Sequence, residues 1–304
     1  MKINVDAGHG SNTAGKRTPP LPQNIDINGD GKIDIKAGEQ YREHYANVGV
    51  AKYLVKELER CKIQTFKTGW NDENAADDPD TGLTTRQSAI ASAGCDYSIS
   101  IHFDAYGDGE SFNSGEGIGV IIHDKYAGQS EKMAQIVLKH LVNGTKQKNR
   151  GVSKQSLAMC NCNAMDTKGA ILCELAFMTN LKEATQMMTS EKFWKECAQE
   201  ICQGVCEYIG VKYIKEGEVI MPSSSISVTS SKEDIIWLQS KLNECLSKNE
   251  SFIPLAVDGD YGPKTRIAVL IYWERLGWGK HMKDDGKKAG KATIEALASG
   301  KKAY

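Results

Sequence analysis

Residues 83–105 read LTTRQSAIASAGCDYSISIHFDA, and this stretch decides the fold. Residues 88–93 follow a helical pattern, whereas residues 97–101 form an apolar run that is typical of a buried strand. His102 comes directly after that run. The stretch therefore predicts a helix, then a strand, and then a titratable side chain at the strand's end.

The same alternation continues on both sides of this stretch. Strand-like apolar runs occur at residues 2–5, 63–66, 118–122 and 170–173. Apolar residues recur at helical spacing over residues 45–58, 130–142 and 191–209. Such alternation predicts an α/β domain with a mostly parallel sheet covered by helices on both faces. In sheets of this kind, functional groups gather at the carboxyl ends of the strands.

A change in composition divides the chain. Its 304 residues are about twice a typical domain length. Residues 213–231 are rich in serine and other polar residues, which is typical of a flexible linker. We therefore expect a larger domain at residues 1–212 and a smaller one at residues 232–304.

Charge and hydropathy narrow the class of protein. The formal net charge is -1, which argues against a protein built mainly to bind nucleic acid. The sequence contains no run of eighteen apolar residues, so we expect no insertion into a membrane. The nine cysteines are scattered through apolar segments, which favours buried, reduced thiols over a disulfide framework. The first residues lead into a strand without the apolar core of a secretory signal, so we expect synthesis in the cytoplasm.

Three titratable residues stand at the ends of three predicted strands: His9, His102 and Glu174. Two imidazoles and one carboxylate form a typical catalytic zinc set, and a further carboxylate is needed to move protons. The residues alone do not decide whether Asp34, Glu39 or Glu43 supplies that further carboxylate. The alternative is that the histidines are ordinary hydrogen-bonded loop residues.

Several motifs, taken together and in order, carry a resemblance to a known family. They are DAGHG at 6–10, REHYANVGVAKYL at 42–54, LTTRQSAIASAGCDYSISIHFDA at 83–105, RGV at 150–152 and AILCELAFMTN at 170–180. This pattern resembles the zinc-dependent N-acetylmuramoyl-L-alanine amidases of the type 3 family, over residues 1 to about 210. The resemblance implies an α/β fold with a six-stranded sheet. It also implies cleavage of the amide between the lactyl group of muramic acid and the first alanine of the stem peptide.

The resemblance also assigns roles. It implies one zinc ion bound by His9, Glu43 and His102, with Glu174 as the catalytic acid and base. Arg86 matches a recurrent arginine of the family, and it is either structural or substrate-orienting. His44 is not a ligand in this alignment, and we expect it on the surface at the start of a helix.

The segment between the first two proposed ligands contains DINGDGKID at residues 26–34. Asp26, Asn28, Asp30 and Asp34 have the spacing of a calcium loop. However, Ala37 stands where such a loop needs a bidentate glutamate. We therefore favour a polar turn, with calcium binding as the alternative.

The smaller domain is predicted to contain three short helices, over residues 235–243, over residues 266–276 and in a final segment ending at Leu297. The turn VDGDYGPKT at residues 257–265, together with Leu238 and Gln239, is similar to the peptidoglycan-binding domain of wall hydrolases. Aromatic residues at positions 261, 272 and 273 are more typical of a core than of a wall-facing surface.

Both resemblances indicate bacterial peptidoglycan as the substrate. We expect a bacteriolytic zinc amidase of the endolysin or mother-cell autolysin kind, made in the cytoplasm and reaching the wall after release. Two alternatives remain: a zinc peptidase that cuts within the stem peptide, and a non-catalytic wall-binding protein.

Overall fold

The computed structural model describes residues 1–218, 221–222, 224–250, 252–279 and 285–302. The chain divides into two compact units, Met1–Tyr213 and Ile214–Tyr304. Within the segment expected to be a linker, residues 219–220 and 223 lie outside the described residues. No helix in the described ranges is long and apolar enough to cross a membrane.

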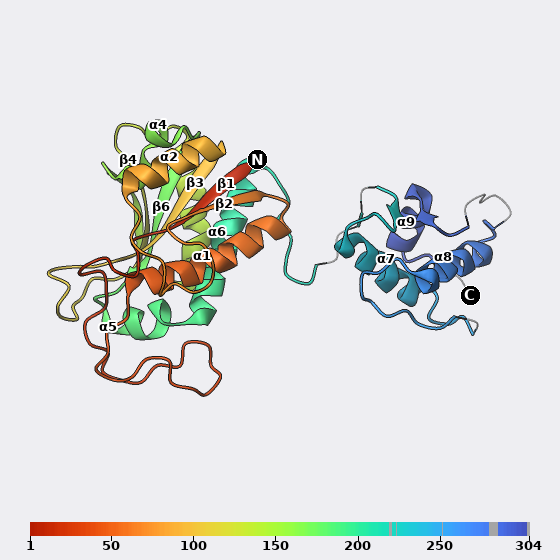
Figure 1. The fold of residues 1–304 in the computed structure, drawn as a ribbon, viewed down its shortest axis with the longest axis horizontal. Helices are drawn as coiled ribbons and strands as arrows, with labels where there is room; N and C mark the ends of the chain where they lie inside the picture. Colours follow the sequence, from red (N-terminus) through yellow and green to blue (C-terminus); the bar gives the residue numbers. More distant parts are fainter. Residues whose placement is uncertain (219–220, 223, 251, 280–284, 303–304) are drawn as a thin grey trace. The chain divides into compact units, whose positions relative to one another are not determined.

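A six-stranded sheet in the order β2-β1-β3-β6-β4-β5 forms the centre of the first unit (Figure 1). Its strands are β1 (Lys2–Ala7), β2 (Gln64–Thr68), β3 (Tyr97–Asp104), β4 (Ile118–His123), β5 (Asn149–Gln155) and β6 (Gly169–Phe177). The four strands β2, β1, β3 and β6 are parallel, whereas β4 is antiparallel to β6 and parallel to β5. The predicted six-stranded, mostly parallel sheet is thus confirmed, and its two reversed strands make it a mixed sheet.

Helices cover both faces of this sheet (Figure 1). On one face α6 (Glu191–Ile209) packs against both α1 (Glu43–Arg60) and α3 (Ser130–Thr145). On the other face α2 (Leu83–Ala93) packs against α4 (Cys162–Met165). A short α5 (Leu181–Glu183) continues into a π-helical turn at Ala184–Met188. A single 3-10 turn, Ala158–Cys160, precedes α4.

The contact between α1 and α6 is close where a glycine of α1 faces a tryptophan of α6. A Cβ on Gly49 of α1 would lie 2.5 Å from the ring of Trp194 on α6. At the start of α6 the Ser190 side chain accepts a hydrogen bond from the backbone N–H of Phe193, and the helix ends at Gly210 in the left-handed conformation. The close approach of Gly49 to Trp194 restrains α1, whose first residue belongs to the candidate site.

The second unit contains three helices in its described residues, as predicted: α7 (Lys232–Cys245), α8 (Pro263–Arg275) and α9 (Lys291–Ala298). Two short strands, β7 (Ile226–Ser227) and β8 (Lys288–Ala289), pair antiparallel beside them. Ile226 is fully buried in the core of this unit. The end of the segment that we expected to be a linker is therefore part of the second unit.

Aromatic side chains fill this small core. Tyr261, Tyr272 and Trp273 are all buried, so the prediction that they belong to the core is confirmed. The indole N–H of Trp273 donates a hydrogen bond to Oγ1 of Thr293 at 2.9 Å, which satisfies its only polar group.

Gln239 organises the VDGDYGPKT turn. Its side-chain amide donates to Oδ1 of Asp258, to the carbonyl of Asp260 and to Oγ1 of Thr265. Its carbonyl oxygen accepts from the backbone N–H groups of Asp258 and Gly259. One buried amide therefore holds the whole turn against α7.

Substitution of this residue should destabilise the second unit. Gln239→Leu keeps the side-chain size but leaves the turn's backbone groups without their partner, so we expect a loss of about 1–3 kcal/mol in unfolding free energy. Calorimetry of the full chain would show this as a lowered unfolding transition of the second unit. Glu244→Gln, which changes an exposed ion pair with Lys241, is the control and should have little effect. An unchanged transition in Gln239→Leu would contradict the role of this amide.

Candidate active site

The turn after β1 brings His9 to the carboxyl edge of the sheet. His9 has a φ of 62°, in the left-handed region that non-glycine residues seldom adopt. A Cβ on Gly8 would lie 2.1 Å from the His102 ring, and one on Gly10 would lie 2.2 Å from the backbone nitrogen of Asp80. The two glycines of DAGHG are therefore required for close approach, and the strained histidine between them must be held by its surroundings.

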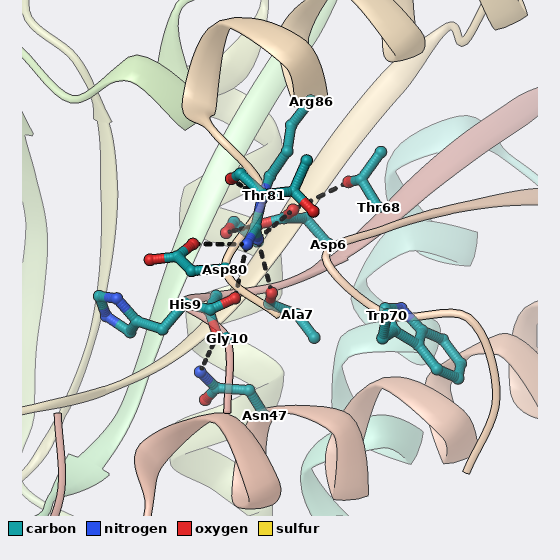
Figure 2. A network of polar contacts seen from close by, with 12 residues as sticks. Asp6, Ala7, His9, Gly10, Asn47, Thr68, Trp70, Asp80, Thr81 and Arg86 are labelled. Carbon is teal, nitrogen blue, oxygen red and sulfur yellow. Dashed lines mark hydrogen bonds and ion pairs between the residues drawn. The ribbon is translucent and has the colours of Figure 1, made fainter. Parts of the chain in front are cut away.

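Arg86 of α2 supplies much of that support (Figure 2). Its guanidinium donates to the backbone carbonyls of Ala7 and His9 and pairs with the carboxylates of Asp6 and Asp80, each at 3.1 Å. The side chain is only 2% exposed. These contacts favour the structural role for Arg86 over the substrate-orienting one.

The carbonyl of Gly8 is held from the opposite side by α1. The Asn47 amide donates to it at 3.0 Å, and Nδ1 of His44 lies 2.9 Å from it (Asn47 is drawn in Figure 2). Nε2 of His44 lies 3.4 Å from the Asp78 carboxylate. His44 is fully buried, so the prediction of a surface position was wrong. The physical reason is that its partner Asp78 lies on a distant loop and folds over the start of α1.

His9, Glu43 and His102 come together at this edge. Oε2 of Glu43 lies 3.2 Å from Nε2 of His9, and Oε1 lies 3.0 Å from Nδ1 of His102. Their ligand atoms all lie within 4.8 Å of one another. Glu43 is the first residue of α1, where the helix dipole favours a negative charge.

Electrostatics within this cluster favour an ionised Glu43. Burial raises the pKa of Glu43, but hydrogen bonds and charge from His102 and His9 outweigh it and hold the pKa below its ordinary value. Burial lowers the pKa of His102, but the hydrogen bond and charge of Glu43 raise it above its ordinary value. The cluster therefore combines an anion with two imidazoles.

Glu174 lies beside this cluster but outside it. Its strand β6 pairs with β3 so that Glu174 is opposite His102. Burial, the largest cause, raises the pKa of Glu174 to about 8, and the charge of Glu43 adds to the effect. Its Oε2 is buried and has no hydrogen-bond partner within the described part of the chain. A carboxyl group in this setting exchanges a proton near neutral pH.

The donor set fits a zinc ion. Two imidazoles and a carboxylate within a few ångströms are ligands that zinc prefers in catalytic sites. Oε2 of Glu43 is buried without a hydrogen bond of good geometry among the described residues, despite its short distance to His9. This oxygen is thus available for coordination.

The calcium-type sequence forms a hydrogen-bonded turn. Asp26 accepts from the backbone N–H groups of Gly29 and Gly31, and Asp34 accepts from that of Ile27. The amide oxygen of Asn28 and Oδ1 of Asp30 cap further N–H groups of the same turn. The backbone hydrogen bond from Gly31 is the largest cause that holds the pKa of Asp26 below its ordinary value. These side chains therefore accept hydrogen bonds from backbone N–H groups of their own turn.

Arg150 and Asp104 are two further charged residues beside Glu174. Nη2 of Arg150 lies 2.7 Å from Oδ2 of Asp104, and its guanidinium stacks over the Phe177 ring at 4.4 Å. The charge of Asp104 raises the pKa of Glu174, and the charge of Arg150 lowers it. Sequence reasoning gave Arg150 no role; its place in the RGV motif was the only signal.

A cavity of about 330 Å³ opens beside the cluster. Its lining includes His9, His102, Leu83 and Met159. Two imidazoles and two carboxylates beside an open cavity, at the carboxyl edge of an α/β sheet, form a site suited to metal-dependent hydrolysis.

Residues 3–207 match the family described as N-acetylmuramoyl-L-alanine amidase. The chain therefore belongs to this family, and it is an amidase of peptidoglycan.

Solved structures show the same fold. An N-acetylmuramoyl-L-alanine amidase from Clostridium difficile 630 is 24% identical, with a TM-score of 0.53, over 70% of this chain and 98% of that one. The catalytic domain of CwlV from Bacillus (Paenibacillus) polymyxa is 21% identical, with a TM-score of 0.51, over 70% of this chain and 99% of that one. Apo Ami1 from Mycobacterium abscessus is also 21% identical, with a TM-score of 0.51, over 69% of this chain and 98% of that one. No match is found among curated proteins.

Arg86→Lys should loosen the turn that carries His9. A lysine ammonium cannot bridge the same set of carbonyls and carboxylates as a planar guanidinium. We expect metal affinity to fall about 10–100-fold, as for other residues that orient a ligand, with a lowered unfolding temperature. Metal titration and thermal unfolding measure these effects. Arg17→Lys, at an exposed position, is the matched control. If Arg86→Lys bound metal with wild-type affinity, Arg86 would not be needed to hold the turn that carries His9.

Proposed function

We propose that the enzyme hydrolyses the amide between N-acetylmuramic acid and L-alanine in a zinc-dependent reaction and so lyses the bacterial cell wall. The observation that supports zinc dependence is the convergence of His9, Glu43 and His102. Beside them lies Glu174, whose Oε2 has no hydrogen-bond partner among the described residues. In this proposal the first three residues hold the ion, and Glu174 moves the proton.

Bound there, zinc would supply positive charge that polarises the scissile carbonyl and makes water more acidic. Glu174 accepts the proton from the attacking water and later donates it to the departing amine of alanine. Its raised pKa suits the second step, because a carboxyl group that holds a proton near neutral pH is an effective acid. The base step requires the ionised form, which nearby positive charge favours.

The second unit is proposed to bind the wall. The similarity of its VDGDYGPKT turn to peptidoglycan-binding domains supports this role. Binding of an insoluble polymer by one unit raises the effective concentration of substrate for the other. Synthesis in the cytoplasm and action after release, as for an endolysin or mother-cell autolysin, complete the proposal.

Loss of the proton-transfer group tests the mechanism. Glu174→Gln removes the acid and base without adding bulk, so we expect stem-peptide release to fall about 10²–10⁴-fold. Mass spectrometry of digested peptidoglycan measures the released intact stem peptides, and elemental analysis should show wild-type zinc content. Glu116→Gln, at an exposed residue that pairs with Lys148, should retain full activity.

The products distinguish the alternatives. Wild-type activity in Glu174→Gln would contradict the proposed mechanism. Fragments cut inside the stem peptide would indicate a peptidase, and wall binding without any cleavage by the wild type would indicate a non-catalytic protein.

Metal removal tests zinc dependence separately. Chelation should abolish activity and lower the unfolding temperature, because a ligand that binds only the native state stabilises it. Added zinc should restore activity in the wild type but not in His9→Ala. His140→Ala, at a histidine that pairs with Glu207, is the control and should respond like the wild type. Full activity in protein shown to be free of metal would refute this part of the proposal.

A further inference from the structure

A second cluster of potential metal ligands lies where α1 ends against α6. Cys202 and Cys206 are four residues apart on α6 and so share one face of that helix. Cys61 is the C-cap residue of α1. Within the described chain, these three cysteines and the catalytic cluster are the only groups whose ligand atoms gather within 4.8 Å of one another.

The spacing of the sulfur atoms fits coordination to a single ion. The Sγ of Cys202 lies 3.8 Å from that of Cys61 and 4.0 Å from that of Cys206. A metal–sulfur bond of about 2.3 Å places two sulfur ligands about 3.8 Å apart in tetrahedral geometry and about 4.0 Å apart in trigonal geometry. Small side-chain rotations would therefore bring all three sulfurs onto one ion.

The surroundings favour a soft ion. All three side chains are at most 5% exposed. The nearby Glu57 carboxylate accepts a hydrogen bond from Tyr213 at 2.7 Å and pairs with Arg60, so it is already engaged. Three sulfurs without a hard oxygen ligand select thiophilic ions over calcium or magnesium.

We propose that Cys61, Cys202 and Cys206 form a second metal site that takes a soft d10 cation, such as zinc or copper(I), through three thiolates. The site joins the C-terminal end of α1 to α6. It is separate from the catalytic cluster in both position and ligand chemistry, and it requires no step of the amidase reaction.

Cadmium is a suitable probe, because thiolate–cadmium bonds absorb in the ultraviolet whereas imidazole and carboxylate ligands give no such band. The full-length His9→Ala variant, reduced and freed of metal, removes one catalytic ligand and leaves the thiols intact. We expect it to bind about one equivalent of cadmium with the thiolate band and to unfold at a higher temperature when loaded. Wild-type protein should show the same band.

Variants of the thiols locate the site. Cys202→Ala and Cys61→Ala should lose the band while retaining amidase activity, which separates this proposal from the proposed function. Cys197→Ala is the matched control, since Cys197 is a buried cysteine of the same helix outside the cluster.

Two results would overturn the proposal. One is the absence of the band in reduced, folded His9→Ala and wild-type proteins, which does not depend on the cysteine variants folding. The other is a persistent band in Cys202→Ala with loss of it in Cys197→Ala, which would place the metal elsewhere.

Discussion

The buried pair of Asp6 and Arg86 is the interaction on which the candidate site depends. Asp6 is fully buried on β1, and its carboxylate also accepts hydrogen bonds from the hydroxyls of Ser100 and Thr68. A buried charge is tolerated only when it is paired and its remaining lone pairs are satisfied. Because the same guanidinium binds the carbonyls of Ala7 and His9, neutralising the charge also fixes the strained turn (Figure 2).

Much of the fold could be predicted because the inner strands β1, β3, β6 and β4 are buried along most of their length and contain apolar runs. The edge strand β5 was not predicted: its sequence, NRGVSKQ, is polar and largely exposed, so it carries no periodic signal. The antiparallel pairing of β4 with β6 could not be predicted either, because an apolar run does not show in which direction the neighbouring strand lies. That direction is set by hydrogen bonds between segments that are distant in the sequence.

The candidate site was predictable in part for a similar reason. Strand ends pointed to His9, His102 and Glu174, and the structure places all three at one edge of the sheet, while their roles stay proposals. Glu43 could be chosen only through the family resemblance, because it lies on a helix. His44 was misjudged because a polar residue at a helix start is ordinarily exposed. Its burial depends on Asp78, in a loop without periodicity.

Helix α1 connects the two clusters of potential ligands. Its 18 residues span about 27 Å, with Glu43 as the first residue and Cys61 as the C-cap. The position of Glu43 therefore depends on how firmly α1 is held along its length, and the close contact of Gly49 with Trp194 supplies one restraint. A bond from Cys61 to α6 would add a second restraint at the far end. If both proposals hold, nitrogen and oxygen atoms of one cluster would serve the reaction, and sulfur atoms of the other would serve the framework.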